Sequence, residues 1–234
     1  MKQKSNSVPV YVLHGWSNET KDWGLFLKSL SKQGVKAELL NIPGLTTDLK
    51  KAWTLDDFVD WFDKQTREGR FSLIAHSFGG RIGIRYDVKH PNRVKKLVLI
   101  DSAGIRPTGI GARIKRSSFK ALASVGKKFT SSEKLRKLLY KAAREKDYHD
   151  ADKIMRETMA SIVSDDQRDE LPYVKADTLI IWGQKDKVTP LSDARLMNKQ
   201  ITGSQLVIVP KARHSPQFTH HKQVAEHVAK FLRG

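Results

Sequence analysis

The sequence predicts an α/β fold, a parallel sheet with helices on both faces. Two observations lead to this. Almost continuous apolar runs are typical of strands buried on both faces of a parallel sheet. Between them lie segments whose apolar residues recur at helical spacing. The strict alternation of strands and helices stops after residue 104 and resumes at about residue 173. The sequence therefore also predicts a helical insertion within the core.

Each apolar run is expected to form one strand of the sheet. The first ends at His14-Gly15-Trp16, and the third leads directly into a segment that contains Ser77. Strands that alternate with helices form right-handed crossovers, which place the helices on both faces of one sheet. The runs are 8–13, 37–42, 71–74, 94–100, 178–182 and 206–209.

The expected helices are amphipathic. Thr54 is a suitable N-cap, with Asp57 three residues later as a short capping-box partner. Gly34 is a typical stop for the first helix. The segments with helical spacing are 20–33, 55–62, 78–89, 191–200 and 224–232.

The insertion covers residues 105–172 and has a basic loop followed by two amphipathic helices, the second around 151–163. We expect a core domain of residues 1–104 and 173–234, with 105–172 as a helical cap, or lid. Ligands of open parallel sheets bind at the carboxyl ends of the strands, so the cap would cover the site.

Composition limits the class of protein. The chain has 234 residues, no cysteine and a formal charge of +18. It has no apolar stretch long enough to cross a membrane and no signal-peptide pattern at its start, so a cytoplasmic location is expected. Seven Lys/Arg and no Asp/Glu lie between residues 105 and 128. This excess indicates either attraction to an acidic partner or a lysine-rich solvated surface.

The segment Ala75-His76-Ser77-Phe78-Gly79-Gly80 joins a strand to a helix and contains one serine. It resembles the G-x-S-x-G nucleophile elbow of the α/β-hydrolase family, with Ala75 in place of the first glycine. Small residues are needed there because the sharp turn brings backbones close together. A serine hydroxyl needs a base and an orienting acid to act as a nucleophile.

Position in the chain selects the partners of Ser77. His214 follows the last strand, from which a loop can reach the serine. Asp186 follows the preceding strand and is the expected acid, and Asp101, also at a strand end, is the fallback. Backbone N–H groups of Trp16 and Phe78 are the expected oxyanion donors. His76 is expected to be a packing residue and His90 a helix cap, whereas the histidines of the last helix are expected at the surface: His220, His221 and His227.

Nearly the whole chain resembles α/β-hydrolases of the esterase, meta-cleavage-product hydrolase and haloperoxidase-like group. Two positions depart from the family pattern, Ala75 and Arg213, where glycine is common. The family's two first edge strands are missing, which implies a reduced, mostly parallel sheet of about six strands. The matching segments are His14-Gly15-Trp16, Ile42-Pro43-Gly44, residues 75–80, 101–104, 182–190 and 213–216.

The resemblance implies a serine hydrolase that cleaves a carboxylic ester or related acyl bond of a small molecule through an acyl-enzyme. It implies no metal or organic cofactor. Alternatives are a carbon–carbon bond hydrolase and a methyl-ester esterase whose substrate is attached to an acidic acyl carrier protein. A different class is a non-catalytic scaffold with a basic lid, although a pure binder needs no serine, histidine and aspartate at three strand ends. Nucleic acid is not an expected partner.

Overall fold

A computed structural model describes residues 8–16, 22–106 and 153–234. These residues contain one six-stranded sheet in the order β2-β1-β3-β4-β5-β6, and every neighbouring pair is parallel. The predicted α/β-hydrolase fold with a sheet of about six strands is thus confirmed. The strands are β1 (Val10–Leu13), β2 (Glu38–Leu40), β3 (Phe71–His76), β4 (Val94–Ile100), β5 (Asp177–Gly183) and β6 (Gln205–Val209).

The strand order reverses direction between β1 and β3. From β1 the chain moves outward to β2 and then returns to the other side of β1, where β3 to β6 follow in sequence. In open parallel sheets the crevice at such a reversal, outside the carboxyl ends of the strands, is where ligands bind. Trp16 follows β1 and Ser77 follows β3, so both lie beside this reversal.

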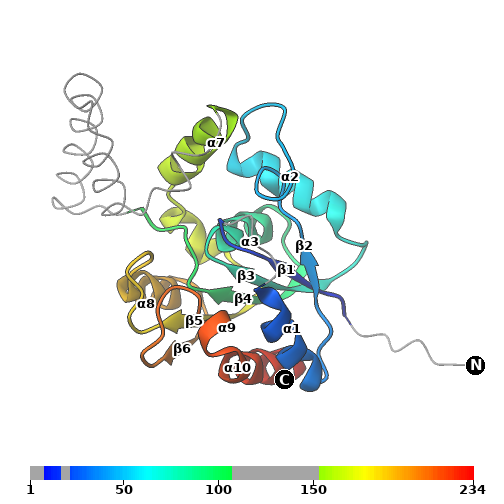
Figure 1. The fold of residues 1–234 in the computed structure, drawn as a ribbon, viewed down its shortest axis with the longest axis vertical. Coiled ribbons are helices and arrows are strands. Elements are labelled where there is room, and N and C mark those ends of the chain that lie inside the picture. The colour runs from blue at the N-terminus through cyan, green and yellow to red at the C-terminus, as the bar shows by residue number, and fades with distance from the viewer. Residues whose placement is uncertain (1–7, 17–21, 107–152) are drawn as a thin grey trace, which may run out of the picture.

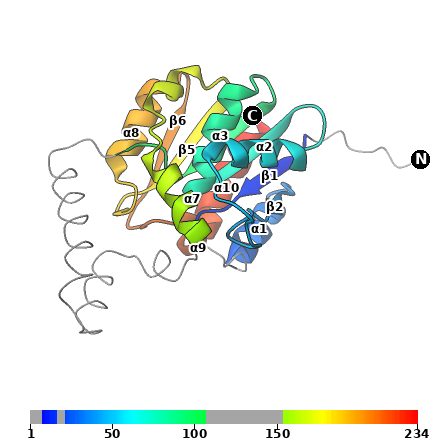
Figure 2. The ribbon, with the colours of Figure 1, turned by 90° about the horizontal axis from the view of Figure 1, so that it is seen from above.

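Helices cover both faces of the sheet (Figures 1 and 2). On one face α1 packs against α10, and on the other α2 packs against α3. In α2 the predicted capping box is present, since Thr54 Oγ1 accepts the Asp57 N–H and Asp57 Oδ2 accepts the Thr54 N–H at 2.8 Å. The helices are α1 (Trp23–Lys32), α2 (Leu55–Gln65), α3 (Phe78–Lys89), α7 (Lys153–Ser164), α8 (Leu191–Gln200), α9 (Pro216–Thr219) and α10 (His221–Arg233).

Alternate residues of β3 supply the two cores. Ile74 packs on the face of α1 and α10, with Trp23 and Phe26. Leu73 and Ala75 pack on the face of α2 and α3. Because both faces are buried, the strand has no solvent-exposed face, which explains why its sequence is mostly apolar.

The predicted cap lies mostly outside the described residues. Its second helix is confirmed as α7, which is followed by the 3-10 helix η1 (Arg168–Tyr173). The basic loop from residue 107 onward and the first cap helix lie outside the described residues, so the division into core and cap stays a prediction. Thr158 Oγ1 of α7 accepts the backbone N–H of Trp53 at 3.0 Å, which ties α7 to the segment before α2.

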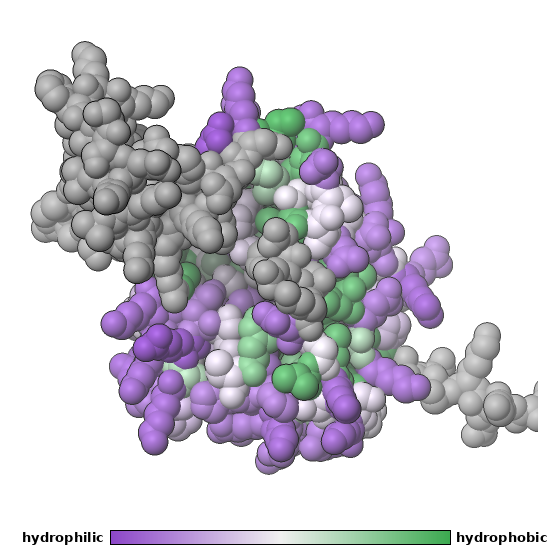
Figure 3. Space-filling model, in the orientation of Figure 1, coloured by the Kyte–Doolittle hydropathy of each residue, from purple (hydrophilic) through white to green (hydrophobic). Residues whose placement is uncertain are grey.

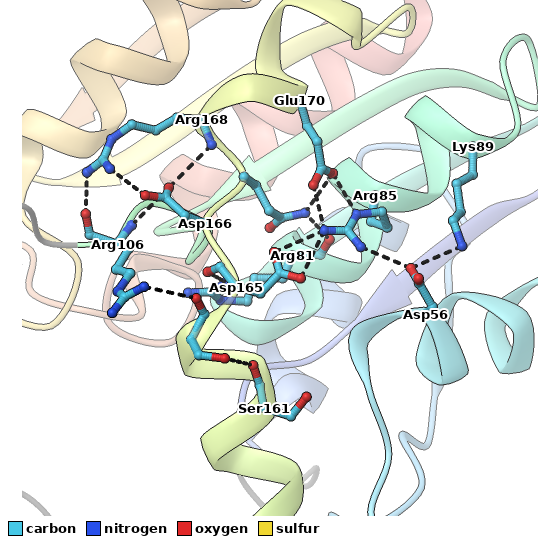
Figure 4. A network of polar contacts seen from close by, with 12 residues as sticks. Asp56, Arg81, Arg85, Lys89, Arg106, Ser161, Asp165, Asp166, Arg168 and Glu170 are labelled. Carbon is cyan, nitrogen blue, oxygen red and sulfur yellow. Dashed lines mark hydrogen bonds and ion pairs between the residues drawn. The ribbon is translucent and has the colours of Figure 1, made fainter.

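A network of ion pairs joins the segment after α7 to the core (Figure 4). The Arg85 guanidinium of α3 contacts carboxylates of Asp56, Asp165 and Glu170 at 3.0, 3.0 and 2.6 Å. Beside it, Asp166 accepts hydrogen bonds from the Arg106 N–H and from Arg168. The return from the insertion is therefore fixed to the helix that begins at Ser77.

Hydrophilic residues form most of the outline in Figure 3, with smaller hydrophobic areas between them. Among the helices described, none is long and apolar enough to cross a membrane.

Candidate active site

Ser77 occupies a strained turn between β3 and α3. Its backbone has φ 50° and ψ −112°, a conformation that L-residues rarely adopt and that costs on the order of 1–3 kcal/mol. The glycines that follow Ser77 have no room for a side chain. A Cβ atom on Gly79 would lie 2.5 Å from the Leu13 carbonyl oxygen, and a Cβ atom on Gly80 would lie 1.9 Å from Ser102 Oγ. The turn has the features of a nucleophile elbow.

Ala75, the departure from the family motif, is fully buried in β3 and tolerated there. The facing residue of α3 is Gly83, where an added Cβ would lie 3.5 Å from Ala75 Cβ. This separation is an ordinary van der Waals contact, so the Ala75 methyl group is accommodated opposite this position of α3 without crowding.

Three predicted residues from different strand ends are linked by hydrogen bonds. Ser77 Oγ lies 3.0 Å from Nε2 of His214, and Nδ1 of His214 lies 2.7 Å from Oδ2 of Asp186. If Nδ1 donates to the carboxylate, Nε2 is left to accept the serine proton. This is the geometry that a Ser-His-Asp relay requires.

The Asp186 carboxylate is held by its own loop. Its Oδ1 accepts the N–H groups of Val188 and Thr189 at 2.7 and 3.2 Å, and its Oδ2 accepts the Thr189 hydroxyl at 2.8 Å. Burial alone would raise the pKa of Asp186, but the hydrogen bond and charge interaction with His214, together with these loop donors, lower it below its usual range. Asp186 is therefore ionised and can stabilise an imidazolium.

Asp101, the fallback acid, does not bond the histidine ring. Its Oδ1 accepts the Gly183 N–H at 2.7 Å and its Oδ2 accepts the Ser215 N–H at 2.8 Å. The carboxyl is fully buried, and burial raises its pKa to about 7 although both amide hydrogen bonds oppose this. Asp186, not Asp101, is hydrogen-bonded to His214.

The loop after β1 lies against the elbow. The Gly79 N–H donates to the His14 carbonyl at 3.1 Å, and the Trp16 and Phe78 rings pack edge to face at 5.1 Å. A Cβ on Gly15 would lie 2.8 Å from Nδ1 of His76, so only glycine fits at this approach. The two residues expected to supply oxyanion donors, Trp16 and Phe78, are thus neighbours.

His14 joins this loop to the segment that follows β2. Its Nε2 accepts the Ile42 N–H at 3.2 Å, which leaves the Nδ1 proton for the Gly15 carbonyl at 2.8 Å. Burial lowers the pKa of His14, in agreement with a neutral ring.

His76 is buried, as expected of a packing residue, but it lies closer to the site than its sequence position indicated. Its ring centroid is 5.0 Å from that of His214, and its Nε2 is 3.3 Å from Ser215 Oγ. Burial lowers the pKa of His76 well below its usual value, as do the nearby His214 and His14 rings. No local sequence signal predicts this contact, because the two residues are 139 positions apart in the chain.

Potential metal-ligand atoms of His76, Asp101 and His214 lie within 4.8 Å of one another. Both nitrogens of His214 bond Ser77 and Asp186, and both oxygens of Asp101 bond backbone amides. Hydrogen bonding within the site accounts for this cluster.

Among the described residues, His220, His221 and His227, which were expected at the surface, are half-buried, whereas His90 lies at the end of α3 as expected. His90 ends α3, where its ring stacks on Tyr86 at 4.5 Å. His221 lies in α10 and contacts Ser29 of α1 at 2.9 Å. The side chain of Arg213 is exposed, and its φ is not positive, so a glycine is not needed before His214.

A nucleophile elbow at the reversal point of a parallel sheet, facing a histidine and an aspartate from later strand ends, defines an α/β-type hydrolase. A family model described as alpha/beta hydrolase fold matches residues 8–221. The chain belongs to this family and is a hydrolase.

Several known proteins are similar over nearly the full chain. AB hydrolase superfamily protein YisY of Bacillus subtilis is 26% identical, covering 95% of this chain and 91% of that protein. Pimeloyl-[acyl-carrier protein] methyl ester esterase of Nitrosomonas europaea is 23% identical, covering 90% of each. The structure of an esterase from Exiguobacterium antarcticum superposes with a TM-score of 0.72 at 20% identity, covering 97% of this chain and 92% of that one. This similarity to the esterase structure shows the fold alone.

Proposed function

We propose that the protein is a serine esterase that cleaves carboxylic esters of small molecules. The observation that carries the proposal is the hydrogen-bonded series from Ser77 through His214 to Asp186. In the reaction, Ser77 Oγ attacks the ester carbonyl while Nε2 of His214 takes the hydroxyl proton. The imidazolium then gives this proton to the leaving alkoxide, which departs as an alcohol.

The negative charge that develops on the carbonyl oxygen needs fixed donors. The backbone N–H groups of Trp16 and Phe78 are proposed for this role, supported by the contact between the two residues and by the bond from Gly79 to His14. Water, activated by His214, then adds to the acyl group on Ser77 and releases the acid. Every step uses groups of this chain and water.

The test combines a probe for the nucleophile with a substrate panel. A fluorophosphonate should label the wild-type protein and the control variant Ser31→Ala, whose serine lies exposed on α1, but not Ser77→Ala. p-Nitrophenyl esters of increasing acyl length measure activity and the acyl group that fits. Equal labelling of wild type and Ser77→Ala would refute Ser77 as the nucleophile, and a dienoate in the panel tests carbon–carbon hydrolysis.

A carrier-linked methyl ester is a narrower candidate. It is supported by the name of the Nitrosomonas relative and by the basic stretch from residue 105 to 128. If an acidic carrier binds there, reversing the charge of Lys115 and Arg116 should raise the KM for the carrier-linked ester and leave that for a free ester unchanged. Turnover that is independent of salt and of this reversal would count against a carrier.

A further inference from the structure

The residue after His214 has a strained backbone. Ser215 has φ 108° and ψ 55°, in the region that favours glycine, and its side chain makes no capping hydrogen bond to α9. It precedes Pro216, the first residue of α9, and its carbonyl accepts the Phe218 N–H at 3.1 Å. Such a conformation persists only where surrounding groups hold it.

Two buried side chains from other strands contact Ser215. Asp101, at the end of β4, accepts its N–H at 2.8 Å, and His76, at the end of β3, lies 3.3 Å from its hydroxyl. The second oxygen of Asp101 accepts the N–H of Gly183 at 2.7 Å, at the end of β5, where the loop of Asp186 begins. The Asp101 carboxylate therefore joins the loop of the base to the strand that leads to the acid.

The Ser215 N–H belongs to the peptide plane that starts at the Cα of His214. A hydrogen bond that holds this plane fixes the position of the His214 Cα, which lies in it. It also opposes movements of the plane that would turn the imidazole away from its two partners. The ring must meet Ser77 Oγ at 3.0 Å and Asp186 Oδ2 at 2.7 Å together, so a small rotation would break one of the two contacts.

We propose that Asp101 is a positioning residue of the hydrolase: through its hydrogen bond to the Ser215 N–H it holds His214 between Ser77 and Asp186. The inference rests on the proposed function, because it takes His214 as the base. Asp101 contacts neither substrate nor the reacting atoms in this role. His76 supports the same loop from the other side, through the Ser215 hydroxyl.

The test is Asp101→Asn, an isosteric change that places an amide NH₂ opposite one of the two backbone donors. Assays at about pH 8, where wild-type Asp101 is mainly ionised, should give a kcat reduced about 10- to 100-fold with KM changed less than about 3-fold. The rate of fluorophosphonate labelling, which also depends on the Ser77–His214 contact, should fall in parallel.

Asp87→Asn is the matched control. Asp87 is also fully buried, and its Oδ2 accepts two backbone N–H groups, of Lys175 and Ala176 at 2.6 and 3.1 Å, but it lies near the far end of α3. Asp87→Asn should lower the melting temperature as Asp101→Asn does, and its kcat should stay within about 2-fold of the wild-type value. An equal loss of kcat in both variants would overturn the proposal, because a general loss of stability would then explain it.

Rescue of kcat by a second substitution distinguishes a positioning role of Asp101 from a general role in folding. Glycine accepts φ 108° without strain, so Ser215→Gly combined with Asp101→Asn should recover part of the lost kcat. The positioning role is refuted if the double variant recovers no kcat, or if Asp101→Asn itself keeps the wild-type kcat while Ser77→Ala is inactive. Either result leaves the esterase proposal intact. An active Ser77→Ala would instead refute the esterase mechanism.

A measurement on the wild-type protein covers the case in which Asp101→Asn does not fold. The Ser215 amide proton should exchange slowly with deuterium, because its acceptor is a buried carboxylate. Slow exchange supports the proposal, and exchange at the rate of an unprotected loop amide contradicts it.

Discussion

Ser77 Oγ and His214 Nε2 lie 3.0 Å apart although 137 positions separate them in the chain. The parallel sheet produces this contact. β3 and β6 have two strands between them, but all carboxyl ends point to one edge, and the loop after β6 reaches back across that edge. Asp186 follows β5, the strand beside β6, and its Oδ2 lies 2.7 Å from Nδ1 of the same imidazole. The contact is thus a consequence of strand direction combined with the loop that follows β6, residues 210–215.

Replacing the acid should reduce the rate without unfolding the protein. In Asp186→Asn the amide can donate to His214 and favour the wrong tautomer, with the proton on Nε2, so kcat for a p-nitrophenyl ester should fall roughly 10³-fold. KM should change little. Asp60→Asn, at an exposed position of α2, is the control and should keep full activity. Full activity in Asp186→Asn would mean that another carboxylate serves the histidine.

Close backbone packing at the elbow should make Gly79 irreplaceable. A Cβ there would lie 2.5 Å from a backbone carbonyl, which cannot move away as a flexible side chain can. Gly79→Ala should therefore reduce the free energy of unfolding by several kcal/mol or prevent folding. Gly24→Ala, in α1 with no atom near an added Cβ, should instead stabilise by about 0.5–1 kcal/mol. Urea denaturation measures both, and equal effects would contradict the steric explanation.

Stability should depend on pH through Asp101. Its pKa is raised to about 7 in the folded protein, against about 3.9 in an unfolded chain. Between these values the folded state keeps a proton that the unfolded state has lost, so this group makes the free energy of unfolding fall as pH rises from about 4 to 7. Above about pH 7 the contribution levels off.

Asparagine cannot titrate, so Asp101→Asn should lack this decline. Denaturation curves from about pH 4 to 8 should show the wild type losing its advantage over the variant as pH rises, on the order of a few kcal/mol across the range. A constant difference between the two proteins at every pH would contradict the raised pKa.

The ion pairs of Arg85 should stabilise the return from the insertion. The Arg85 side chain is 17% exposed and contacts three carboxylates, so Arg85→Met leaves partly buried negative charges close together. We expect a loss of about 1–3 kcal/mol in the free energy of unfolding, measured by denaturation. Lys153→Ala removes the ion pair with Glu157, in which both side chains are exposed. This variant should change the free energy of unfolding by less than about 0.5 kcal/mol. Similar losses in both variants would argue against burial as the cause.

Much of the fold was predictable because its signals are local. β3 and β5 are mostly apolar because both of their faces are buried. The start of α2 is marked by the Thr54–Asp57 capping box. Six short segments in family order also identified Ser77, Asp186 and His214, which the structure brings together. The signal was the place of each of these residues in the segment that follows a strand.

The contacts of Asp101 and His76 could not be predicted, because no local pattern encodes them. From the sequence, Asp101 was the fallback acid, and only its distances to the Ser215 and Gly183 amides show that it bonds the backbone and not the histidine ring. From the sequence, His76 was expected to be a packing residue. Its contact with Ser215 depends on how the end of β3 and the loop after β6 approach each other at the sheet edge.

By itself, therefore, the sequence determined the class of fold, the order of the strands along the chain and the residue types that follow each strand, since hydrophobic periodicity and short motifs are properties of neighbouring residues. Only the tertiary structure decided which of the two aspartates meets the histidine and what holds the strained Ser215. Those choices rest on distances of about 3 Å between side chains and amides far apart in the chain, which are fixed when the two cores pack and set the loops over one edge of the sheet.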